Sequence, residues 1–513
     1  MGSIARHPKG LYVLFATEMW ERFNYYGLRA ILVLFMTKVL LFDKILASSI
    51  YGSYTSLVFL SPLLGGFIAD KFWGNKKSII AGGLTMAIGE LMLFVCASKL
   101  GSIPSNEMQD LTKNGLDLNL MYFFIGLGFM IGGNGFFKAN ISSLVGQLYA
   151  QNDSRKDAAY TIFYMGINLG GALGPYICGL VGDTGRPEDF KWGFLAGGIG
   201  MLLSVVVQLL FHKKYVKDPN GKVLGLQPEN CHKSMKSIFI IPVVLVSFSL
   251  LSFALLYIDS VKFSYLFFLL LACTLGIAFI VFSDTSLNKL QKKKILVIFI
   301  VSFFVIFFWS CFEQAGVSLT FFTNEQTDRT LHFGTKIFEI PTSWFQSVNS
   351  FFIIIFAFIF AWMWGKLGKR GPNAYVKMAI GLFILSLSFI WLAFGTKGIS
   401  PGVKVSMLWI VGVYLMHTWG ELLLSPIGLS LVNNLSPLKY SSLLMAVWFT
   451  SNASANKLAG VLSALYPEPN PTKLLGFHIN NLFDFFLVFM VLAGIAGIIL
   501  LLLSKKLQQL ATE

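Results

Sequence analysis

The chain has 513 residues, of which 55% are hydrophobic and 13% are charged. So few charges cannot coat the surface of a water-soluble protein of this length, and the composition therefore predicts a protein embedded in a lipid bilayer. The formal net charge of +15 does not indicate nucleic-acid binding, because the lysines and arginines stand in short clusters between apolar stretches, a pattern typical of membrane orientation.

Apolar segments follow one another along the whole chain, and each is long enough to cross the hydrocarbon core as a helix, which takes about 20 residues. The alternating runs of about 10 residues that form membrane β-barrels are not seen. Charges within the first apolar segment exclude a signal-peptide core, so we expect this segment to remain in the protein. The fourteen predicted spans are 11–39, 48–69, 77–99, 119–147, 158–181, 192–212, 237–257, 263–283, 295–322, 343–364, 373–395, 405–434, 441–464 and 479–504.

The basic residues predict the orientation of these spans. An even number of spans places both termini on one side of the membrane. The opposite loops are poorer in Lys and Arg by about a factor of two, so we expect both termini in the cytoplasm. The basic clusters on the predicted cytoplasmic side are Lys71, Lys76, Lys77, Arg155, Lys156, Lys213, Lys214, Lys217, Lys289, Lys292, Lys293, Lys294, Lys366, Lys369, Arg370, Lys505 and Lys506.

The longest polar stretch, residues 213–236, follows the sixth span and is predicted to be a cytoplasmic linker. The two spans after it hold almost no polar residue, so we expect them beside the transport path and not along it. Without them the spans divide six and six, the symmetry of transporters built from two helical bundles. We predict an all-α membrane protein with a six-helix bundle at 1–212, a linker with two extra helices at 213–294 and a second six-helix bundle at 295–513.

The first span contains Glu18, Glu21, Arg22 and Arg29 inside an otherwise apolar stretch, and each would cost about 2.5–3.5 kcal/mol at the centre of a membrane. At 100° per residue Glu18, Arg22, Tyr25 and Arg29 fall on one stripe of the helix, with Glu21 at its edge. One interpretation is an internal ion pair that only holds helices together. The other is a site for protons and substrate.

Polar residues recur inside other spans, and several are four residues apart, which places them on one helix face. A single one is often only a packing contact worth about 0.6 kcal/mol, so none proves a site by itself. These residues are Asn134, Lys138, Tyr164, Asn168, Trp309, Glu313, Gln346, Asn349, His417, Trp419, Glu421, Trp448, Asn452 and Asn456.

Charges of opposite sign are spread over both halves of the chain. Arg29 and Lys138 lie in the first half, and Glu313 and Glu421 in the second. A zwitterion such as a dipeptide requires both a cation and an anion, and the same charges could pair across the bundles when no ligand is bound. Aromatic side chains would form tolerant walls for varied ligand side chains. These are Tyr25, Tyr26, Tyr164, Trp309 and Trp448.

Several segments resemble the proton-dependent oligopeptide transporter family of the major facilitator superfamily. ATEMWERFNYYGLRA, residues 16–30, has that family's ExxERFxYYG motif at every defined position. Its other motifs resemble GGFIADKFWGNKK from Gly65, GNGFFKANIS from Gly133, FYMGINLGGALGP from Phe163, FEQAGVSL from Phe312, GELLLSPIGLS from Gly420 and MAVWFTSNASAN from Met445. The resemblance covers both halves of the chain, and it implies the bacterial type, whose two extra helices lie beside the core.

The resemblance implies a symporter that imports di- and tripeptides with protons by alternating access and requires no cofactor. It assigns proton coupling to Glu18, Glu21, Arg22 and Glu313. It implies the cross-bundle salt bridges Arg29–Glu313 and Lys138–Glu421. The expected peptide-binding residues are Arg29, Tyr25, Tyr26, Lys138, Asn168, Tyr164, Trp309, Gln346, Asn349, Glu421, Trp448 and Asn452. We expect a monomer in the bacterial inner membrane that also accepts peptidomimetics and binds no nucleic acid.

The chain departs from the family at a few positions. Phe59 stands where the family usually has a tyrosine, Gly52 where animal relatives have a histidine, and Ser350 where a proline often follows Asn349. Glu90, inside the third span, is not explained by any of these motifs.

Two alternatives to peptide transport are open. A carrier of nitrate or another small anion could have the same fold, although the intact ExxER motif favours peptides. An intramembrane enzyme is the other, but the sequence contains no HExxH or GxSxG motif. The five cysteines show no ligand or disulfide spacing, so neither a metal site nor a disulfide is predicted.

Overall fold

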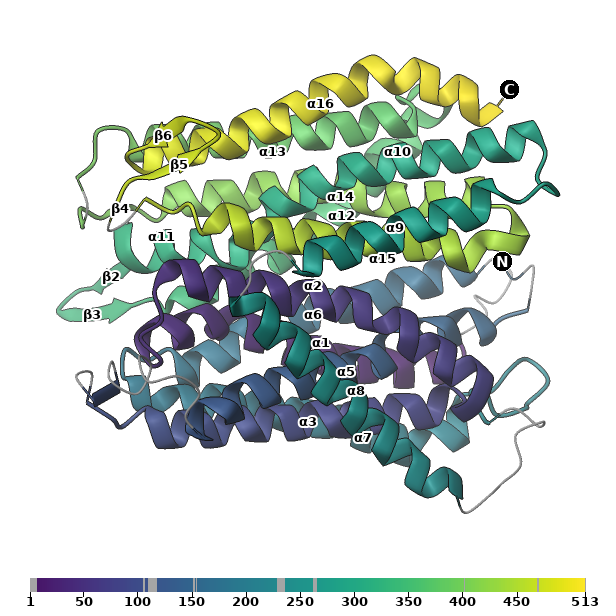
Figure 1. Cartoon of the computed structure of the whole chain (residues 1–513), viewed down its shortest axis with the longest axis horizontal. Helices are drawn as coiled ribbons and strands as arrows, with labels where there is room; N and C mark the ends of the chain where they lie inside the picture. The colour runs from purple at the N-terminus through teal and green to yellow at the C-terminus, as the bar shows by residue number, and fades with distance from the viewer. Residues whose placement is uncertain are drawn as a thin grey trace. The chain divides into compact units, whose positions relative to one another are not determined.

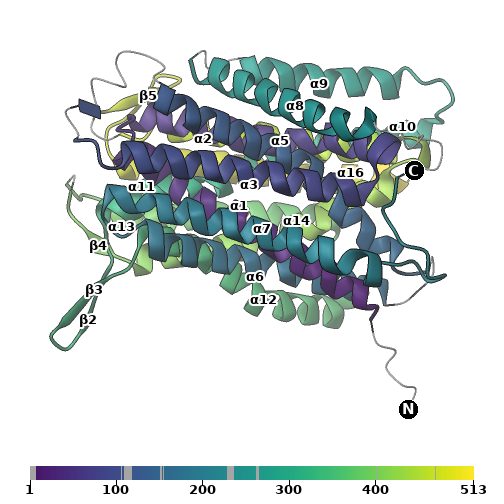
Figure 2. The ribbon, with the colours of Figure 1, turned by 90° about the horizontal axis from the view of Figure 1, so that it is seen from below.

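The structure is a computed structural model of the chain, shown in Figures 1 and 2. It describes residues 7–104, 107–108, 118–150, 153, 155–227, 236–261, 265–400, 402–467 and 470–512. The long helices in these ranges are α1 (Lys9–Lys38), α2 (Lys44–Ile68), α3 (Asn75–Leu100), α5 (Leu118–Gln147), α6 (Lys156–Gly182), α7 (Phe190–Tyr215), α8 (Lys236–Val261), α9 (Tyr265–Phe282), α10 (Lys289–Phe312), α12 (Phe345–Leu367), α13 (Ala374–Thr396), α14 (Leu408–Leu435), α15 (Ser441–Ser463) and α16 (Leu482–Thr512).

Each long helix overlaps one predicted span, so the predicted all-α fold is confirmed. Twelve of the helical stretches in the described ranges are long and apolar enough to cross a membrane. The two long helices outside this set are α1 and α15, which carry charged and amide residues of the predicted site. Their polarity requires that protein or water, and not lipid, surround those side chains.

The chain forms two compact units. The first comprises Met1–Phe42 and Leu57–Ile258, and the second comprises Asp43–Ser56 and Asp259–Glu513. Helix α2 therefore contributes its first half to the second unit and its second half to the first. The predicted three-part division of the chain, with boundaries after residues 212 and 294, stays a prediction.

In the first unit, α1 packs against α6 and α7, and α3 packs against α5 and α7. Figure 1 shows these helices running side by side. Phe35 lies at the centre of an aromatic cluster, with its ring centroid 5.0 Å from that of Phe194 and 5.8 Å from that of Phe190. Helix α8 lies against α5, where Gly128 and Gly132 leave no room for a side chain beside Ser249.

In the second unit, α13 packs against α14 and α16, and α10 packs against α15 and α16. Stacked rings fill the space between them, with Phe389 and Phe489 centroids 4.9 Å apart. Short strands lie in the loops of this unit. β2 (Thr330–Phe333) and β3 (Lys336–Glu339) form an antiparallel hairpin that projects beyond the helix ends in Figure 2. A second hairpin joins β5 (Thr472–Leu474) to β6 (Phe477–Ile479), and β1 (Thr327–Asp328) pairs in parallel with β4 (Val405–Ser406).

The ninth predicted span is not one continuous helix. Helix α10 ends at Phe312, a 3₁₀ turn covers Glu313–Gly316, and α11 (Ser318–Gln326) continues the chain. The amide of Gln314 donates to the Ser310 carbonyl at 3.0 Å, and its oxygen accepts from Ser318 Oγ at 2.5 Å. These bonds satisfy polar groups that a break inside a membrane helix would otherwise leave without partners.

The polar linker after α7 folds back onto the start of α3. The Lys76 amide donates to the Gly225 carbonyl at 2.9 Å, and Lys77 Nζ donates to Gln227 Oε1 at 2.7 Å. His212, near the end of α7, lies 3.0 Å from the Leu224 carbonyl. This part of the predicted linker is therefore anchored to the first unit, whereas residues 228–235 lie outside the described ranges.

Candidate functional site

The charged residues of the ExxERFxYYG motif form a compact buried cluster on α1. Arg22 Nε lies 2.5 Å from Glu21 Oε2 and 3.2 Å from Glu18 Oε1, and Arg22 Nη2 donates to Glu21 Oε1 at 2.8 Å. All three side chains are at most 4% exposed. One guanidinium therefore serves two carboxylates, and the planar fork of arginine allows this because it presents several donors at once.

The cluster lies at the contact of α1 with α6. A Cβ atom added to Gly170 would lie 2.8 Å from Arg22 Cβ, and one added to Gly174 would lie 2.9 Å from the Gly27 nitrogen. Only glycine allows this approach of the two backbones. Spacing the glycines four residues apart along one face of α6 is typical of close contacts between membrane helices.

Helix α5 brings two more predicted residues to the cluster. Asn134 donates to Glu21 Oε1 at 3.1 Å and is 1% exposed. One turn further along, Lys138 interacts electrostatically with Glu18. Its ammonium lies 4.3 Å from the centroid of the Phe59 ring on α2, an arrangement typical of a cation–π contact. Phe59, the departure from the family pattern, therefore contacts a predicted site residue.

The other predicted residues of the first unit extend the site along α1 and α6. Arg22 lies over the Tyr25 ring at 5.2 Å and Arg29 over the Tyr26 ring at 5.8 Å. The two tyrosine rings are 5.2 Å apart in a T-shaped arrangement. On α6, the Asn168 amide donates to the carbonyl of Tyr164 at 2.9 Å, which leaves its side-chain oxygen as an acceptor.

In the second unit, α12 and α14 are linked through two predicted residues. Asn349 Nδ2 donates to Glu421 Oε2 at 3.2 Å and to Thr418 Oγ1 at 3.0 Å. Glu421 thus has a neutral amide beside its carboxylate. Gln346, three residues before Asn349, donates to Thr320 Oγ1 at 3.1 Å.

Glu313 lies in the 3₁₀ turn between α10 and α11, and it is 4% exposed. Trp309 and Phe312, on the turn before it, have ring centroids 5.0 Å apart. On α15, Trp448 is 4% exposed, and its carbonyl accepts from Asn452 Nδ2 at 2.8 Å. Discontinuous helices form substrate and coupling-ion sites in many transporters, so the position of Glu313 at a helix break makes it a candidate site residue.

These contacts do not test every prediction made for the site. The salt bridges Arg29–Glu313 and Lys138–Glu421 would each join residues of different units, so they stay predictions. Helix α12 continues past Ser350 to Leu367. Among the described residues, no group of three or more His, Cys, Asp or Glu side chains could hold a metal ion.

Sequence reasoning missed a second buried charge cluster, in the second unit. Lys457 Nζ on α15 lies 2.5 Å from Asp259 Oδ2, near the end of α8, and donates to Ser53 Oγ at 2.9 Å. Ser53 donates to the same Asp259 oxygen at 2.5 Å, and the Leu266 amide donates to Asp259 Oδ1 at 3.0 Å. The signal for it was a lysine inside the thirteenth predicted span, whose partner lay two residues beyond the seventh.

A membrane protein whose long elements are all helices, and whose buried charges gather at glycine-lined helix contacts and at a helix break, has the architecture of a secondary transporter. The POT family matches residues 76–476. The chain belongs to this family, and the predicted major facilitator fold is confirmed.

Two similar relatives and one solved structure agree with this assignment. The chain is 34% identical over 514 residues to the uncharacterized transporter YclF of Bacillus subtilis, with 98% of this chain and 95% of the relative covered. It is 35% identical over 474 residues to the peptide transporter YePEPT of Yersinia enterocolitica, with 89% and 87% covered. The crystal structure of a mutant of the peptide transporter POT in complex with alafosfalin has a TM-score of 0.78 and 30% identity, covering 100% of this chain and 97% of that one. The family and these relatives are transporters and not enzymes.

Proposed function

We propose that the protein is a proton-coupled symporter that imports di- and tripeptides. The observation that carries the proposal is the buried cluster of Glu18, Glu21 and Arg22, in which two carboxylates share one guanidinium. Membership of the POT family and the likeness to a peptide transporter support the substrate class. The coupling ion is a proton, and no cofactor takes part.

The proton acts by changing the charge balance of this cluster. With both carboxylates ionised, Arg22 is held by two anions. A proton on Glu21 removes one of them and weakens the hold on Arg22, which alters the contact of α1 with α6 and α5. Burial makes this effect large, because charges in a low-dielectric environment are poorly screened.

The peptide is held by groups of both signs. Arg29, Lys138 and Asn168 bind its carboxylate and backbone, and Glu421 binds its amine with Asn349 beside it. The walls around the side chains of the peptide are formed by Tyr25, Tyr26, Tyr164, Trp309 and Trp448. Gln346 and Asn452 add hydrogen-bonding groups. Glu313 participates in proton coupling, and the pairs Arg29–Glu313 and Lys138–Glu421 form and break during alternating access.

Proteoliposome uptake with an imposed pH gradient tests the role of Glu21. The variant Glu21→Gln should lose accumulation of labelled dipeptide and retain downhill peptide exchange, because a neutral amide can fill the site but cannot cycle a proton. Glu188→Gln, which changes an exposed loop carboxylate, is the matched control and should accumulate peptide like the unmodified protein. Accumulation by Glu21→Gln, or accumulation with a protonophore present, contradicts the proposal.

The same assay distinguishes the anion-carrier alternative. A peptide transporter should lose labelled-dipeptide uptake in the presence of unlabelled di- and tripeptides, whereas nitrate and free amino acids should compete weakly. Competition by nitrate as strong as that by peptide would favour the anion carrier. We propose that the protein works as a monomer in the bacterial inner membrane with both termini in the cytoplasm.

A further inference from the structure

Glu90, in the middle of α3, is a buried carboxyl group that the proposed transport site does not use. It is 1% exposed, and its Oε1 accepts a hydrogen bond from Asn24 Nδ2 at 2.6 Å. Asn24 lies on α1 at one of the undefined positions of the ExxERFxYYG motif, between Phe23 and Tyr25. At this position the motif segment carries a neutral amide that donates to a carboxyl group of another helix.

Small and apolar groups pack around Glu90. From α7, Gly197 and Gly198 lie against its side chain. From α5, Met130 packs beside Gly89, the residue before Glu90. On α6, the Cys178 thiol interacts electrostatically with Glu90. Among the residues that the structure describes, Glu90 has no ion-pair partner.

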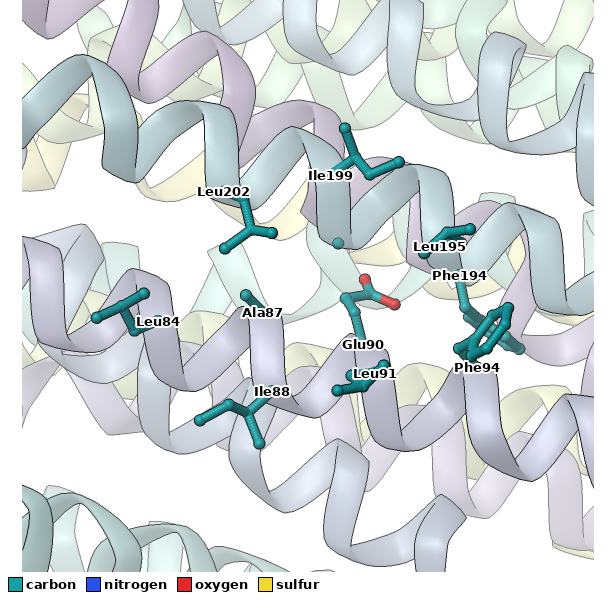
Figure 3. Close-up of a pocket in the computed structure, with 11 residues that line it drawn as sticks. Leu84, Ala87, Ile88, Glu90, Leu91, Phe94, Phe194, Leu195, Ile199 and Leu202 are labelled. Atoms are coloured by element: carbon teal, nitrogen blue, oxygen red, sulfur yellow. The ribbon is translucent and has the colours of Figure 1, made fainter.

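The carboxyl group also borders an apolar cavity of about 360 Å³ between α3 and α7. Figure 3 shows it directed into the space between these helices, among Leu195, Ile199 and Leu202. Ile199 and Leu202 are about half exposed on the outer face of the first unit, where lipid would cover them. An ionised carboxylate in such surroundings is strongly disfavoured, because neither water nor a cation stabilises its charge.

The hydrogen bonding of Asn24 and Glu90 also disfavours an ionised Glu90. Glu90 Oε2 and Asn24 Oδ1 are both buried, and neither has a hydrogen-bond partner among the described residues. Both atoms are acceptors when Glu90 is ionised, so neither can satisfy the other. A proton on Oε2 converts that oxygen into a donor, and a carboxylic acid and a carboxamide can then form two hydrogen bonds with each other.

We propose that Glu90 is a proton-binding site separate from the cluster at Glu18, Glu21 and Arg22, and that it holds its proton in the conformation described. The proton completes a paired hydrogen bond with Asn24 that joins α3 to α1. It thereby positions the helix that carries the motif, and it is held during transport instead of being passed on.

Infrared difference spectroscopy of the purified protein at neutral pH tests the protonation state directly. The spectrum of the unmodified protein minus that of Glu90→Gln should contain the carbonyl stretch of a protonated carboxylic acid, shifted in heavy water because the proton exchanges. A carboxylate band in its place overturns the proposal. This measurement requires no transport, so its result is independent of the proposed function.

Thermal unfolding in detergent tests the paired hydrogen bond. Glutamine copies the protonated acid, because its amide nitrogen donates and its oxygen accepts, so Glu90→Gln should unfold at the same temperature as the unmodified protein or above it. Glu90→Leu should unfold at a lower temperature because it leaves the Asn24 amide unsatisfied, and adding Asn24→Leu should recover part of the loss. If glutamine destabilises the protein as much as leucine does, the proposal is wrong.

Discussion

Phe59 shows how one departure from a family pattern changes the groups that surround a predicted site residue, Lys138. The phenyl ring cannot offer the hydroxyl that a tyrosine would, but its face lies 4.3 Å from the ammonium. Such a contact is worth about 0.5–2 kcal/mol, depending on how far water is excluded. The cation therefore keeps a stabilising neighbour at the position where the family pattern is not met.

Glu421 gives a prediction at the same scale. Replacing Glu421 with glutamine should weaken binding of a free-amine dipeptide by about 1.5–3 kcal/mol, the usual contribution of a hydrogen bond to a charged group. An N-acetylated form of the same dipeptide should lose much less affinity, because it carries no ammonium. Isothermal titration calorimetry of the purified protein with both peptides measures the difference.

The matched control for this experiment is Glu339→Gln, which removes a half-exposed carboxylate on the β2–β3 hairpin. It should leave both affinities unchanged. If Glu421→Gln weakens both peptides equally, Glu421 acts on the conformation of the protein. If it weakens neither, the amine is bound elsewhere.

At the scale of elements, the buried pair of Lys457 and Asp259 assigns a role to the two extra helices. Asp259 lies near the end of α8, where the chain enters the second unit for the second time, and it binds both Ser53 on α2 and Lys457 on α15. The Leu266 amide of α9 binds the same carboxylate. The end of α8 and the start of α9 are thus joined through a carboxylate that also neutralises a lysine of α15.

Breaking this pair should destabilise the protein. Asp259→Asn leaves the Lys457 ammonium buried without its anion, and loss of one partner of a buried salt bridge typically costs about 3–5 kcal/mol. The double variant Asp259→Leu with Lys457→Met removes both charges and should recover most of that loss. Chemical or thermal unfolding in detergent compares the two. Equal stability of Asp259→Asn and the unmodified protein would contradict the role assigned to the pair.

Orientation in the membrane is a property of the whole molecule. Lys214, exposed near the end of α7, and Phe333, 66% exposed on the β2–β3 hairpin, are separated in the chain by α8, α9 and the interrupted stretch from α10 to α11. If each of these stretches crosses the membrane once, we expect the two residues on opposite sides of it. A cysteine in place of Lys214 should react with an impermeant thiol reagent only from the cytoplasm, and one in place of Phe333 only from outside.

The two cysteines are introduced into a variant whose native cysteines are replaced. Labelling after solubilisation in detergent shows whether each introduced cysteine can react at all. Reversed labelling would show that the basic clusters do not determine the orientation. Labelling of both positions from the same side would contradict the number of spans between them.

The sequence by itself determined the membrane class, the number of long helices and the face of α1 that carries the charges. These features depend on local quantities, namely the length of apolar segments and the 100° rotation per residue. The resemblance to the ExxERFxYYG motif pointed to Glu18, Glu21 and Arg22, and these three side chains meet because they lie close together on one helix.

The tertiary structure decided which residues from distant parts of the chain meet. Asn24 and Glu90 are 66 positions apart, and Asp259 and Lys457 are 198 positions apart. Neither pairing follows from periodicity, because it depends on which helices pack together and at what height. The break at Glu313 was also hidden. The Gln314 side chain bonds to the Ser310 carbonyl and to the Ser318 hydroxyl there, and a hydropathy pattern contains no record of hydrogen bonds made after folding.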